Sequence, residues 1–315
     1  MISVQAQVVQ FFFTSDLHYG ITRPHFRGKD SVASYIVNAA QVQAIKSVPH
    51  VDAVIVTGDI ANREEKGIQS ASVSWKEFLH DYKYDLKTKL LVTSGNHDAS
   101  NASAHPKILF RDAGSMTGML ELEEAKHIDT SVFNYHSEKL NYSRNLGGVH
   151  CMFVNIWPDS ANRIWMEKDL SSVSKKMPVL IFTHDPPQGD PKHFTNTASR
   201  ISENLLEEKY KDSDSGSTLA EQKGFIAFLT RHPGIKAYFH GHENFCEMYS
   251  YQGIPVFRSD SPMKGKESRE DETKLSFQLV TLDLPHHRMI VKQFFWNARA
   301  RAGNLILGKQ RTVPL

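Results

Sequence analysis

The chain alternates short apolar runs with longer stretches in which apolar residues recur every three or four positions. Short runs rich in β-branched and aromatic residues predict buried strands, and the longer period predicts amphipathic helices. The predicted strands are 8–13, 52–57, 89–93, 148–155, 179–183, 235–240, 254–258, 277–284 and 289–295. The predicted helices are 31–48, 73–84, 163–173, 201–210 and 219–230.

The order of these elements predicts an α/β protein. Strand–helix alternation in the first half favours layered α/β folds, whereas the second half ends in strands. The last two predicted strands turn at Pro285-His286-His287 and resemble an antiparallel hairpin. A chain that begins with crossovers and finishes with hairpins suggests two mixed sheets packed face to face, with helices outside. We find no internal repeat and no long linker, so we expect a single domain over residues 1–300 and a C-terminal tail over 301–315.

Composition and charge narrow the function classes. The chain has 315 residues, of which 40% are hydrophobic and 23% charged, as in an ordinary soluble globular protein. A net charge of +2 is too small to suggest a nucleic-acid partner, and no apolar run is long enough to span a membrane. Cys151 and Cys246 lie in strand-like surroundings, where a buried free thiol is favoured over the alternative of one disulfide.

The first residues bear on the cellular compartment. The segment from Ser3 to Gln7 resembles the end of a secretory signal peptide, but the charged and apolar regions that precede such an end are missing. The pattern leans towards an exported protein, periplasmic or secreted, with a cytoplasmic protein as the alternative.

Short polar clusters follow five of the predicted strands. In layered α/β folds ligands bind beyond the carboxyl ends of strands, so these clusters can meet in one site. Each cluster alone has a plain structural interpretation as a turn or an interior histidine, but chance does not easily place all five directly after strands. The clusters are Asp16-Leu17-His18, Gly58-Asp59, Gly95-Asn96-His97-Asp98, Thr183-His184-Asp185 and His240-Gly241-His242-Glu243-Asn244.

The residue types in these clusters indicate a metal site. Carboxylate, imidazole and amide ligands suit Mn, Fe, Zn, Ni or Mg, and differ from the thiolates of structural zinc sites. Asp59 follows a tight turn at Gly58 and could bridge two ions. Two divalent ions bring four positive charges, and Asp16 and Asp59 return two negative ones. A centre that stays electropositive suits a phosphate ester.

Taken together, the clusters from Asp16 to Asn244 resemble the signature of the calcineurin-like metallophosphoesterase superfamily. The resemblance implies that family's fold, a double β-sheet sandwich flanked by helices (α/β/β/α), over the predicted domain. It also implies two divalent or trivalent metal ions as cofactors. The implied ligands of the first metal are Asp16, His18 and the bridging Asp59, and those of the second metal are Asp59, Asn96, His184 and His242.

The resemblance further implies that His97 is the catalytic histidine that acts as an acid or binds phosphate, with Asp98 orienting its ring. One position departs from the family pattern, because Asn244 stands where Gly-His-X-His usually ends. Either Asn244 is a weaker ligand of the first metal, with His240 beside the site, or His240 and His242 form the ligand pair. We favour the first alignment, because the Gly241 turn should fix the register.

Asn62 also bears on the choice among subfamilies. Purple acid phosphatases would have a metal-binding tyrosine near this position, and are excluded by the asparagine. The resemblance implies a hydrolase of phosphate esters, preferentially monoesters, that works by attack of a metal-bridging hydroxide. The alternatives are a phosphodiesterase, for example on cyclic nucleotides or lipid-linked diesters, and a non-catalytic metal-binding module. The expected partner is a small phosphorylated substrate, not a nucleic acid.

The sequence leaves substrate recognition open. The segment 186–217, rich in Pro, Gly, Ser and His, is expected to form a lid or specificity loop. Five loop residues could clamp a phosphate or could be ordinary surface residues: Arg23, His25, Arg144, Arg163 and His193.

Overall fold

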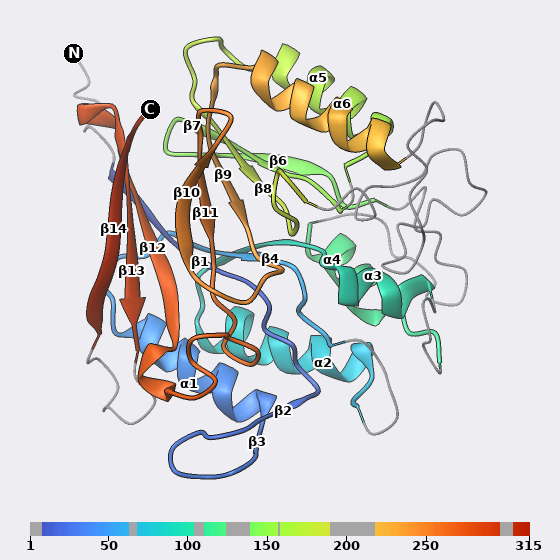
Figure 1. The fold of residues 1–315 in the computed structure, drawn as a ribbon, viewed down its shortest axis with the longest axis vertical. Helices are drawn as coiled ribbons and strands as arrows, with labels where there is room; N and C mark the ends of the chain where they lie inside the picture. The colour runs from blue at the N-terminus through green and yellow to red at the C-terminus, as the bar shows by residue number, and fades with distance from the viewer. Residues whose placement is uncertain are drawn as a thin grey trace.

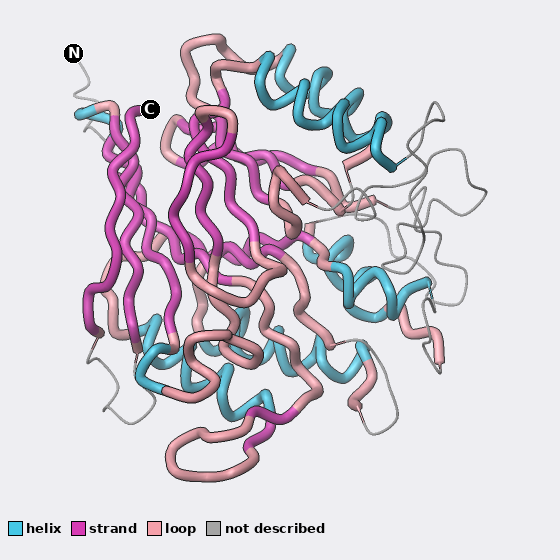
Figure 2. Tube along the Cα trace, in the orientation of Figure 1, coloured by secondary structure: helices cyan, strands magenta, loops and turns pink. Residues whose placement is uncertain are grey.

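The computed structural model describes residues 8–62, 68–103, 110–123, 139–156, 158–189, 218–296 and 305–315 (Figures 1 and 2). Several predictions fall outside these ranges. They are the signal-like segment 3–7, the helix 201–210, His193 and most of the expected lid 186–217.

The first sheet has six strands in the order β14-β13-β12-β1-β4-β5. β1, β4 and β5 pair in parallel, and the other neighbours pair antiparallel. β4 is buried along its whole length, as expected of a central parallel strand with both faces covered. The bounds are β1 Val8–Thr14, β4 Ala53–Thr57, β5 Lys89–Thr93, β12 Ser276–Asp283, β13 Arg288–Phe295 and β14 Ile306–Pro314.

The second sheet also has six strands, in the order β10-β11-β9-β8-β7-β6. Its four central strands run parallel, and the strands at the two edges run antiparallel to their neighbours. The bounds are β6 Tyr142–Leu146, β7 Val149–Phe153, β8 Val179–Phe182, β9 Ile235–His240, β10 Glu247–Tyr251 and β11 Ile254–Arg258. A small separate pair joins β2 (Thr22–Arg23) to β3 (Val32–Ala33).

Helices cover the outer faces of both sheets. Figure 1 shows α1 and α2 beside the first sheet and the α5–α6 pair over the second. The predicted α/β/β/α sandwich is therefore confirmed. The bounds are α1 Ser34–Lys46, α2 Ala71–Phe78, the π-helix η1 Leu79–Asp85, α3 Asn96–Ser103, α4 Gly114–Leu122, α5 Ser160–Ser171, α6 Thr218–Arg231, and the 3₁₀ turns η3 Glu272–Lys274 and η4 Leu284–His286.

Aromatic side chains fill the space between the two sheets. Phe11 and Phe13 of β1 meet Phe182 of β8 and Phe239 of β9 edge to face, with ring centroids 5.1 to 6.3 Å apart. All four rings are fully buried. Such pairs stabilise the fold beyond the burial of their area, because the positive edge of one ring meets the negative face of the other. The packing fixes how the strand ends of one sheet face those of the other.

The predicted elements within the described ranges are confirmed, with ends shifted by a few residues. The predicted hairpin is β12–β13, which turns through η4 with His287 in a left-handed conformation. Residues 73–84, predicted as one helix, are divided between α2 and η1. Residues 306–314, expected within a C-terminal tail, instead form β14 against β13. Most of its side chains are exposed or half-buried, so backbone pairing rather than apolar periodicity defines this strand.

Two smaller expectations concern the cysteines and the membrane. Cys151 and Cys246 are buried and free, so the disulfide alternative is wrong. None of the helices that the structure describes is both long enough and apolar enough to cross a bilayer.

Candidate metal centre

The polar clusters form unusual turns where the strands end. Five of the predicted site residues have a left-handed backbone, which non-glycine residues rarely adopt. Such strain persists where surrounding structure enforces it, and it gathers at functional sites. The φ angles are 56° at Asp16, 43° at His18, 49° at Asp59, 71° at His242 and 59° at Asn244.

Backbone hydrogen bonds join these turns to one another. The Asp16 amide donates to the Gly58 carbonyl at 3.0 Å, and the Gly241 amide donates to the His184 carbonyl at 3.0 Å. The two sheets are then linked, because the His242 amide donates to Asp16 Oδ2 at 2.9 Å. The loops after β1, β4, β8 and β9 therefore converge at one end of the sandwich.

Two glycines allow neighbouring backbone to pack closely against the carboxylates of Asp59 and Asp16. A Cβ atom at Gly95 would lie 2.2 Å from both the backbone nitrogen and Oδ1 of Asp59. A Cβ atom at Gly241 would lie 2.2 Å from Asp16 Oδ2. Neither distance is sterically possible, so both positions require glycine as long as the two carboxylates keep their places.

Asp59 lies at the centre of the cluster. Its Oδ2 is 3.4 Å from His184 Nε2, 3.7 Å from His18 Nε2 and 3.8 Å from His97 Nε2. Its Oδ1 accepts a hydrogen bond of 2.8 Å from the His97 amide. Asp16 Oδ1 lies 3.8 Å from His18 Nε2. One carboxylate thus faces three imidazoles, as the predicted bridging role of Asp59 requires.

Asn96 contacts two imidazoles that follow strands of the second sheet. Its Oδ1 is 3.0 Å from His184 Nε2 and 2.9 Å from His242 Nδ1. His184 Nδ1 donates to the Thr57 carbonyl at 2.7 Å, because a carbonyl only accepts. That bond fixes the orientation of the ring and turns Nε2 towards Asp59 and Asn96. Groups that accept a hydrogen bond from a metal-binding histidine commonly orient its ring in this way.

Several buried polar atoms at this place fit a metal ion. Within the described residues, neither nitrogen of the His18 ring has a hydrogen-bond partner, although His18 is only 1% exposed. Asp16 Oδ1 and Asn244 Oδ1 are likewise buried without such a partner there. Unpaired buried polar groups are costly, and cations would bind the lone pairs of one His18 ring nitrogen, Asp16 Oδ1 and Asn244 Oδ1. The donor set of carboxylate, imidazole and amide suits a divalent metal.

The electrostatics point the same way. Burial raises the pKa of Asp16 to about 6. Burial would also raise the pKa of Asp59, but the rings of His184 and His97 hold that pKa well below its usual range. Burial would lower the pKa of His184, but the Asp59 carboxylate raises it to about 10. The cluster therefore stabilises positive charge beside Asp59, which a bound metal ion would supply in place of a proton.

His240 lies beside the centre rather than in it. Its ring is buried, with Nδ1 donating to the Gly241 carbonyl at 3.0 Å and Nε2 3.0 Å from the Tyr249 hydroxyl. Both nitrogens are thus engaged, which favours the alignment that keeps Gly241 and His242 in register. Asn244 donates from Nδ2 to the His242 carbonyl at 3.2 Å, which leaves its Oδ1 as the metal-facing candidate. The role of Asn244 as a ligand stays a prediction.

Asp98 is bound to backbone amides of two loops. Its carboxylate accepts bonds from the Gly95, Ile60 and Ala61 amides at 3.0, 3.2 and 3.1 Å. These bonds engage both oxygens, so Asp98 fixes the loops after β4 and β5, and its expected role of orienting the His97 ring stays a prediction. Two of these donors, Ile60 and Ala61, belong to the loop after β4, so Asp98 joins that loop to the first turn of α3.

The sequence prediction omitted one potential ligand. Asp185 is buried, and its Oδ1 lies 3.5 Å from His242 Nδ1. Together with His184 and His242 it forms a group that could hold a metal ion. The signal was present in the sequence, since Asp185 directly follows His184 in the cluster after β8.

The loop cations considered as phosphate clamps are engaged elsewhere. Arg23 is buried and donates to the carbonyls of Pro262 and Ser268. The other two candidate arginines pair with carboxylates, Arg144 with Glu123 at 2.8 Å and Arg163 with Glu221 at 2.7 Å. His25 is exposed.

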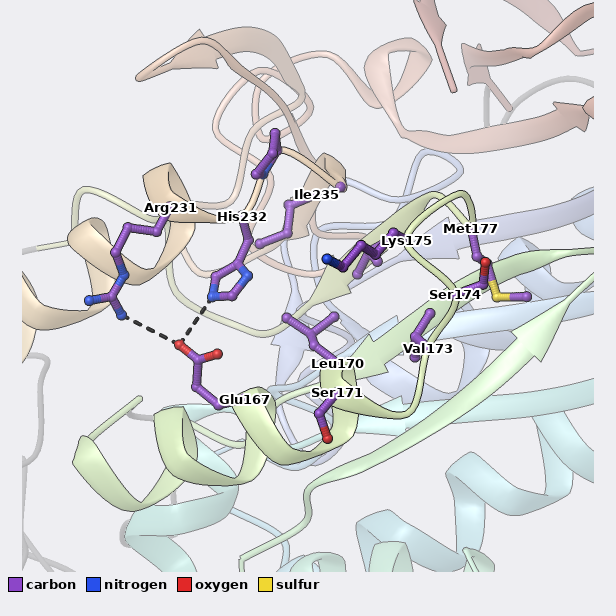
Figure 3. A pocket seen from close by; sticks show the side chains of 13 residues that line it. Glu167, Leu170, Ser171, Val173, Ser174, Lys175, Met177, Arg231, His232 and Ile235 are labelled. Carbon is purple, nitrogen blue, oxygen red and sulfur yellow. Dashed lines mark hydrogen bonds and ion pairs between the residues drawn. The ribbon is translucent and has the colours of Figure 1, made fainter.

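Two hollows differ in their relation to the centre. One of about 370 Å³ opens beside it and is lined by Pro186, Gln188, Gly189, His242, Glu243, Asn244 and Lys266. Another, of about 490 Å³, lies where β8 and β9 begin (Figure 3). On its rim Glu167 pairs with Arg231 at 3.4 Å and His232 at 3.1 Å. The candidate ligands follow the opposite ends of β8 and β9, so of these two hollows the first is the one that adjoins them.

Comparison with known proteins agrees with this architecture. The family model of the calcineurin-like phosphoesterases matches residues 9–245. A dimetal phosphatase from Danio rerio superposes with a TM-score of 0.59 at 11% identity, covering 97% of this chain and 98% of that one. PhoD superposes with a TM-score of 0.56 at 10% identity, covering 97% of this chain and 69% of that one. At such identities the two structures establish a shared fold. No curated protein is significantly similar in sequence.

Proposed function

Because the chain belongs to the calcineurin-like phosphoesterase family, we propose that it hydrolyses phosphate esters, preferentially monoesters, with the help of two divalent metal ions. One observation carries the proposal. His18, His97 and His184 each place Nε2 within 3.8 Å of Asp59 Oδ2, in a buried cluster built from both sheets.

The residues present suit two adjacent ions that share Asp59. Asp16, His18 and Asn244 would hold the first ion, and Asn96, His184 and His242 would hold the second. Bound there, such ions lower the pKa of water and neutralise the oxygens of a phosphoryl group. The protein's own contribution is to hold these ligands in place before substrate arrives, and the backbone bonds between the turns do so.

His97 is the proposed proton donor. Its side chain is 20% exposed, in contrast to the fully buried His184, so it can reach a substrate. Its amide is tied to Asp59 Oδ1 and its ring packs edge-on against His18, with centroids 4.9 Å apart. In hydrolysis water forms a new bond to phosphorus as the bond between phosphorus and the leaving oxygen breaks, and a protonated His97 would give its proton to that oxygen.

Metal analysis combined with two chromogenic substrates tests the proposal. The purified protein, loaded separately with Mn²⁺, Mg²⁺, Zn²⁺, Ni²⁺ or Fe²⁺, is assayed with p-nitrophenyl phosphate and with bis(p-nitrophenyl) phosphate. We expect close to two ions per chain and faster hydrolysis of the monoester. Preference for the diester would support the phosphodiesterase alternative. Metal binding without hydrolysis of either ester would support a non-catalytic module and overturn the proposal.

A further inference from the structure

The hollow of about 370 Å³ beside the candidate metal centre adjoins two of the candidate ligands, His242 and Asn244. A group that occupies it would therefore lie next to a phosphoryl group bound at the centre. The volume of the hollow falls within the range of pockets that bind small organic molecules. The hollow thus has the place and the size to receive the alcohol portion of a phosphate ester, which is the part that leaves in hydrolysis.

Lys266 contributes a positive charge to the lining of this hollow. It lies in the loop that joins β11 to β12 (orange in Figure 1), and its side chain is exposed. Its amide donates to the Asn244 carbonyl at 2.7 Å, which fixes its backbone beside the centre. Among the described residues that line the hollow, Lys266 is the only lysine or arginine.

An aromatic ring holds the Lys266 ammonium close to Asn244. Nζ lies over the ring of Phe245, 4.6 Å from its centroid, which is within the distance at which the negative face of a ring attracts a cation. A phenyl ring has no net charge, so the ammonium can still attract an anion. Within the described part of the chain, Lys266 forms no ion pair with a carboxylate.

The acidic residue that lines the same hollow is paired within the protein. Glu243 forms an ion pair with the buried Arg258, which also pairs with Glu247 and donates from Nε to the Phe245 carbonyl at 3.2 Å. The Arg258 guanidinium lies 3.5 Å from the centroid of the Phe245 ring. These contacts fix the ring over which Lys266 lies, and they place a cation beside Glu243.

We propose that this hollow is a leaving-group subsite in which the Lys266 ammonium binds a carboxylate carried by the alcohol portion of the substrate. The preferred substrates are then phosphate monoesters of small alcohols or phenols that bear a carboxylate. One ammonium compensates one negative charge, so a carboxylate fits it better than a second phosphate dianion. The inference rests on the proposed function and adds a substrate class to it. A cation held in place before substrate arrives loses less entropy on binding.

Three matched aryl phosphates test this inference. Phenyl phosphate, 4-carboxyphenyl phosphate and 4-carbamoylphenyl phosphate share one ring, and the carbamoyl ester has nearly the shape of the carboxylated one without its charge. Wild type, Lys266→Met and Lys266→Arg are loaded with Mn²⁺, their metal content is measured, and kcat and KM are determined for each ester. Lys175→Met is the matched control, because Lys175 is an exposed lysine that lines the other hollow. Comparison with the wild type on the same ester cancels the intrinsic reactivity of each leaving group.

We expect Lys266→Met to lower kcat/KM on the carboxylated ester, relative to the carbamoyl ester, about 3- to 5-fold, the size of one exposed ion pair. The change should be mainly in KM, because the carboxylate is bound equally before and during the reaction. Lys266→Arg should keep most of the wild-type ratio, and Lys175→Met all of it. The effect should shrink in about 1 M salt, which screens exposed charges. An unchanged ratio in Lys266→Met, or an equal loss on both esters, would overturn the inference.

Unreactive phosphonates separate this inference from the proposed function. Calorimetric titration of the Mn²⁺-loaded protein compares 4-(phosphonomethyl)benzoate with benzylphosphonate, which lacks the carboxylate. The wild type should bind the carboxylated phosphonate about 3- to 5-fold more tightly than Lys266→Met does. If the wild type shows this preference but hydrolyses no ester, the proposed function fails, and the role of Lys266 in binding a carboxylate is still supported. Hydrolysis without this preference, or binding of neither phosphonate, would contradict the inference.

Discussion

At the scale of single residues, contacts within the protein fix several atoms of the candidate metal centre before any ligand binds. Asp59 receives the His97 amide on one oxygen and faces His18 and His184 with the other. His97 Nε2 lies 3.8 Å from the same second oxygen, and its side chain is 20% exposed. This contrast in burial is the basis on which we propose Asp59 as a metal ligand and His97 as the residue that meets substrate.

Asp59→Asn and His97→Asn should consequently have different effects. Asp59→Asn removes the charge shared by the proposed ions, so we expect most bound metal and essentially all phosphatase activity to be lost. His97→Asn should keep metal near the wild-type level and lower kcat on p-nitrophenyl phosphate about 10²- to 10⁴-fold, the usual contribution of a general acid. Elemental analysis with steady-state kinetics distinguishes the two. Equal loss of metal in both variants would show that the division of roles is wrong.

Gly241 offers a test of the close approach between the sheets. A Cβ atom there would lie 2.2 Å from Asp16 Oδ2 and would displace the carboxylate or the His242 turn. We expect Gly241→Ala to lose at least about tenfold in metal affinity, the size of effect seen when the support of a ligand is removed. Gly234→Ala is the control, since nothing lies within 4 Å of its added Cβ. Metal titration that finds both variants unchanged would contradict this account.

The sequence predicted this centre because each ligand candidate follows a strand, and strand ends meet at one edge of a sheet. It could not predict where side chains turn after the backbone is placed. Asp98 accepts backbone amides from two loops, and His240 turns to Tyr249. Lys266 reaches the hollow beside the centre from a loop far along the chain, through contacts that no local pattern records.

At the scale of elements, α5 depends on a defined start. Asp159 precedes the helix, accepts the Asn162 amide at 2.9 Å, and pairs with Lys139. The helix is not strongly apolar, and Asn162 and Met166 are its buried residues. Its position over the second sheet thus relies on the cap as well as on packing, because the first N–H groups of a helix have no partners within it.

Asp159→Ala should destabilise the fold by about 1–2 kcal/mol, the usual cost of losing such a cap. Urea unfolding followed by circular dichroism measures the change as a lower midpoint at an unaltered slope. Ile164→Ala, on the same helix but 70% exposed, should change stability by no more than about 0.5 kcal/mol. If the two variants unfold alike, the cap does not contribute as the contacts indicate.

Elements with a strong apolar pattern were predicted correctly, and those defined mainly by pairing were not. β4 is buried throughout and was predicted nearly to its ends, whereas β6, β10 and β14 are edge strands with mixed exposure. A half-exposed edge strand is stabilised by hydrogen bonds to its neighbour, which the sequence of one segment does not reveal. The π-helix η1 likewise continues the apolar period of α2 and differs only in its backbone bonding.

At the scale of the whole molecule, the proposed ions would connect the two sheets. Asp16 and Asp59 follow strands of the first sheet, and His184 and His242 follow strands of the second. The sheets already meet through apolar packing such as Phe11 against Phe182, and through the bond from the His242 amide to Asp16. Without a cation, Asp16 Oδ1 and the ring nitrogens of His18 have no hydrogen-bond partner among the described residues at this end of the sandwich.

Metal binding should therefore stabilise the entire fold and not only the site. An ion that binds the folded protein alone adds about 2.7 kcal/mol to the free energy of unfolding at a hundred times its Kd. For a chain of this size that corresponds to a rise in Tm of roughly 5 °C. Scanning calorimetry of the metal-stripped protein with and without Mn²⁺ measures the change.

Asp59→Asn supplies the control for that measurement, because it should lower the response to Mn²⁺ while the apolar core stays intact. A wild type whose Tm does not respond to Mn²⁺, Mg²⁺, Zn²⁺, Ni²⁺ or Fe²⁺ would contradict the prediction. So would a variant that responds as strongly as the wild type, since the ion would then bind elsewhere. The stabilisation should appear as a single shifted transition, because ligands drawn from both sheets couple the ion to the unfolding of both.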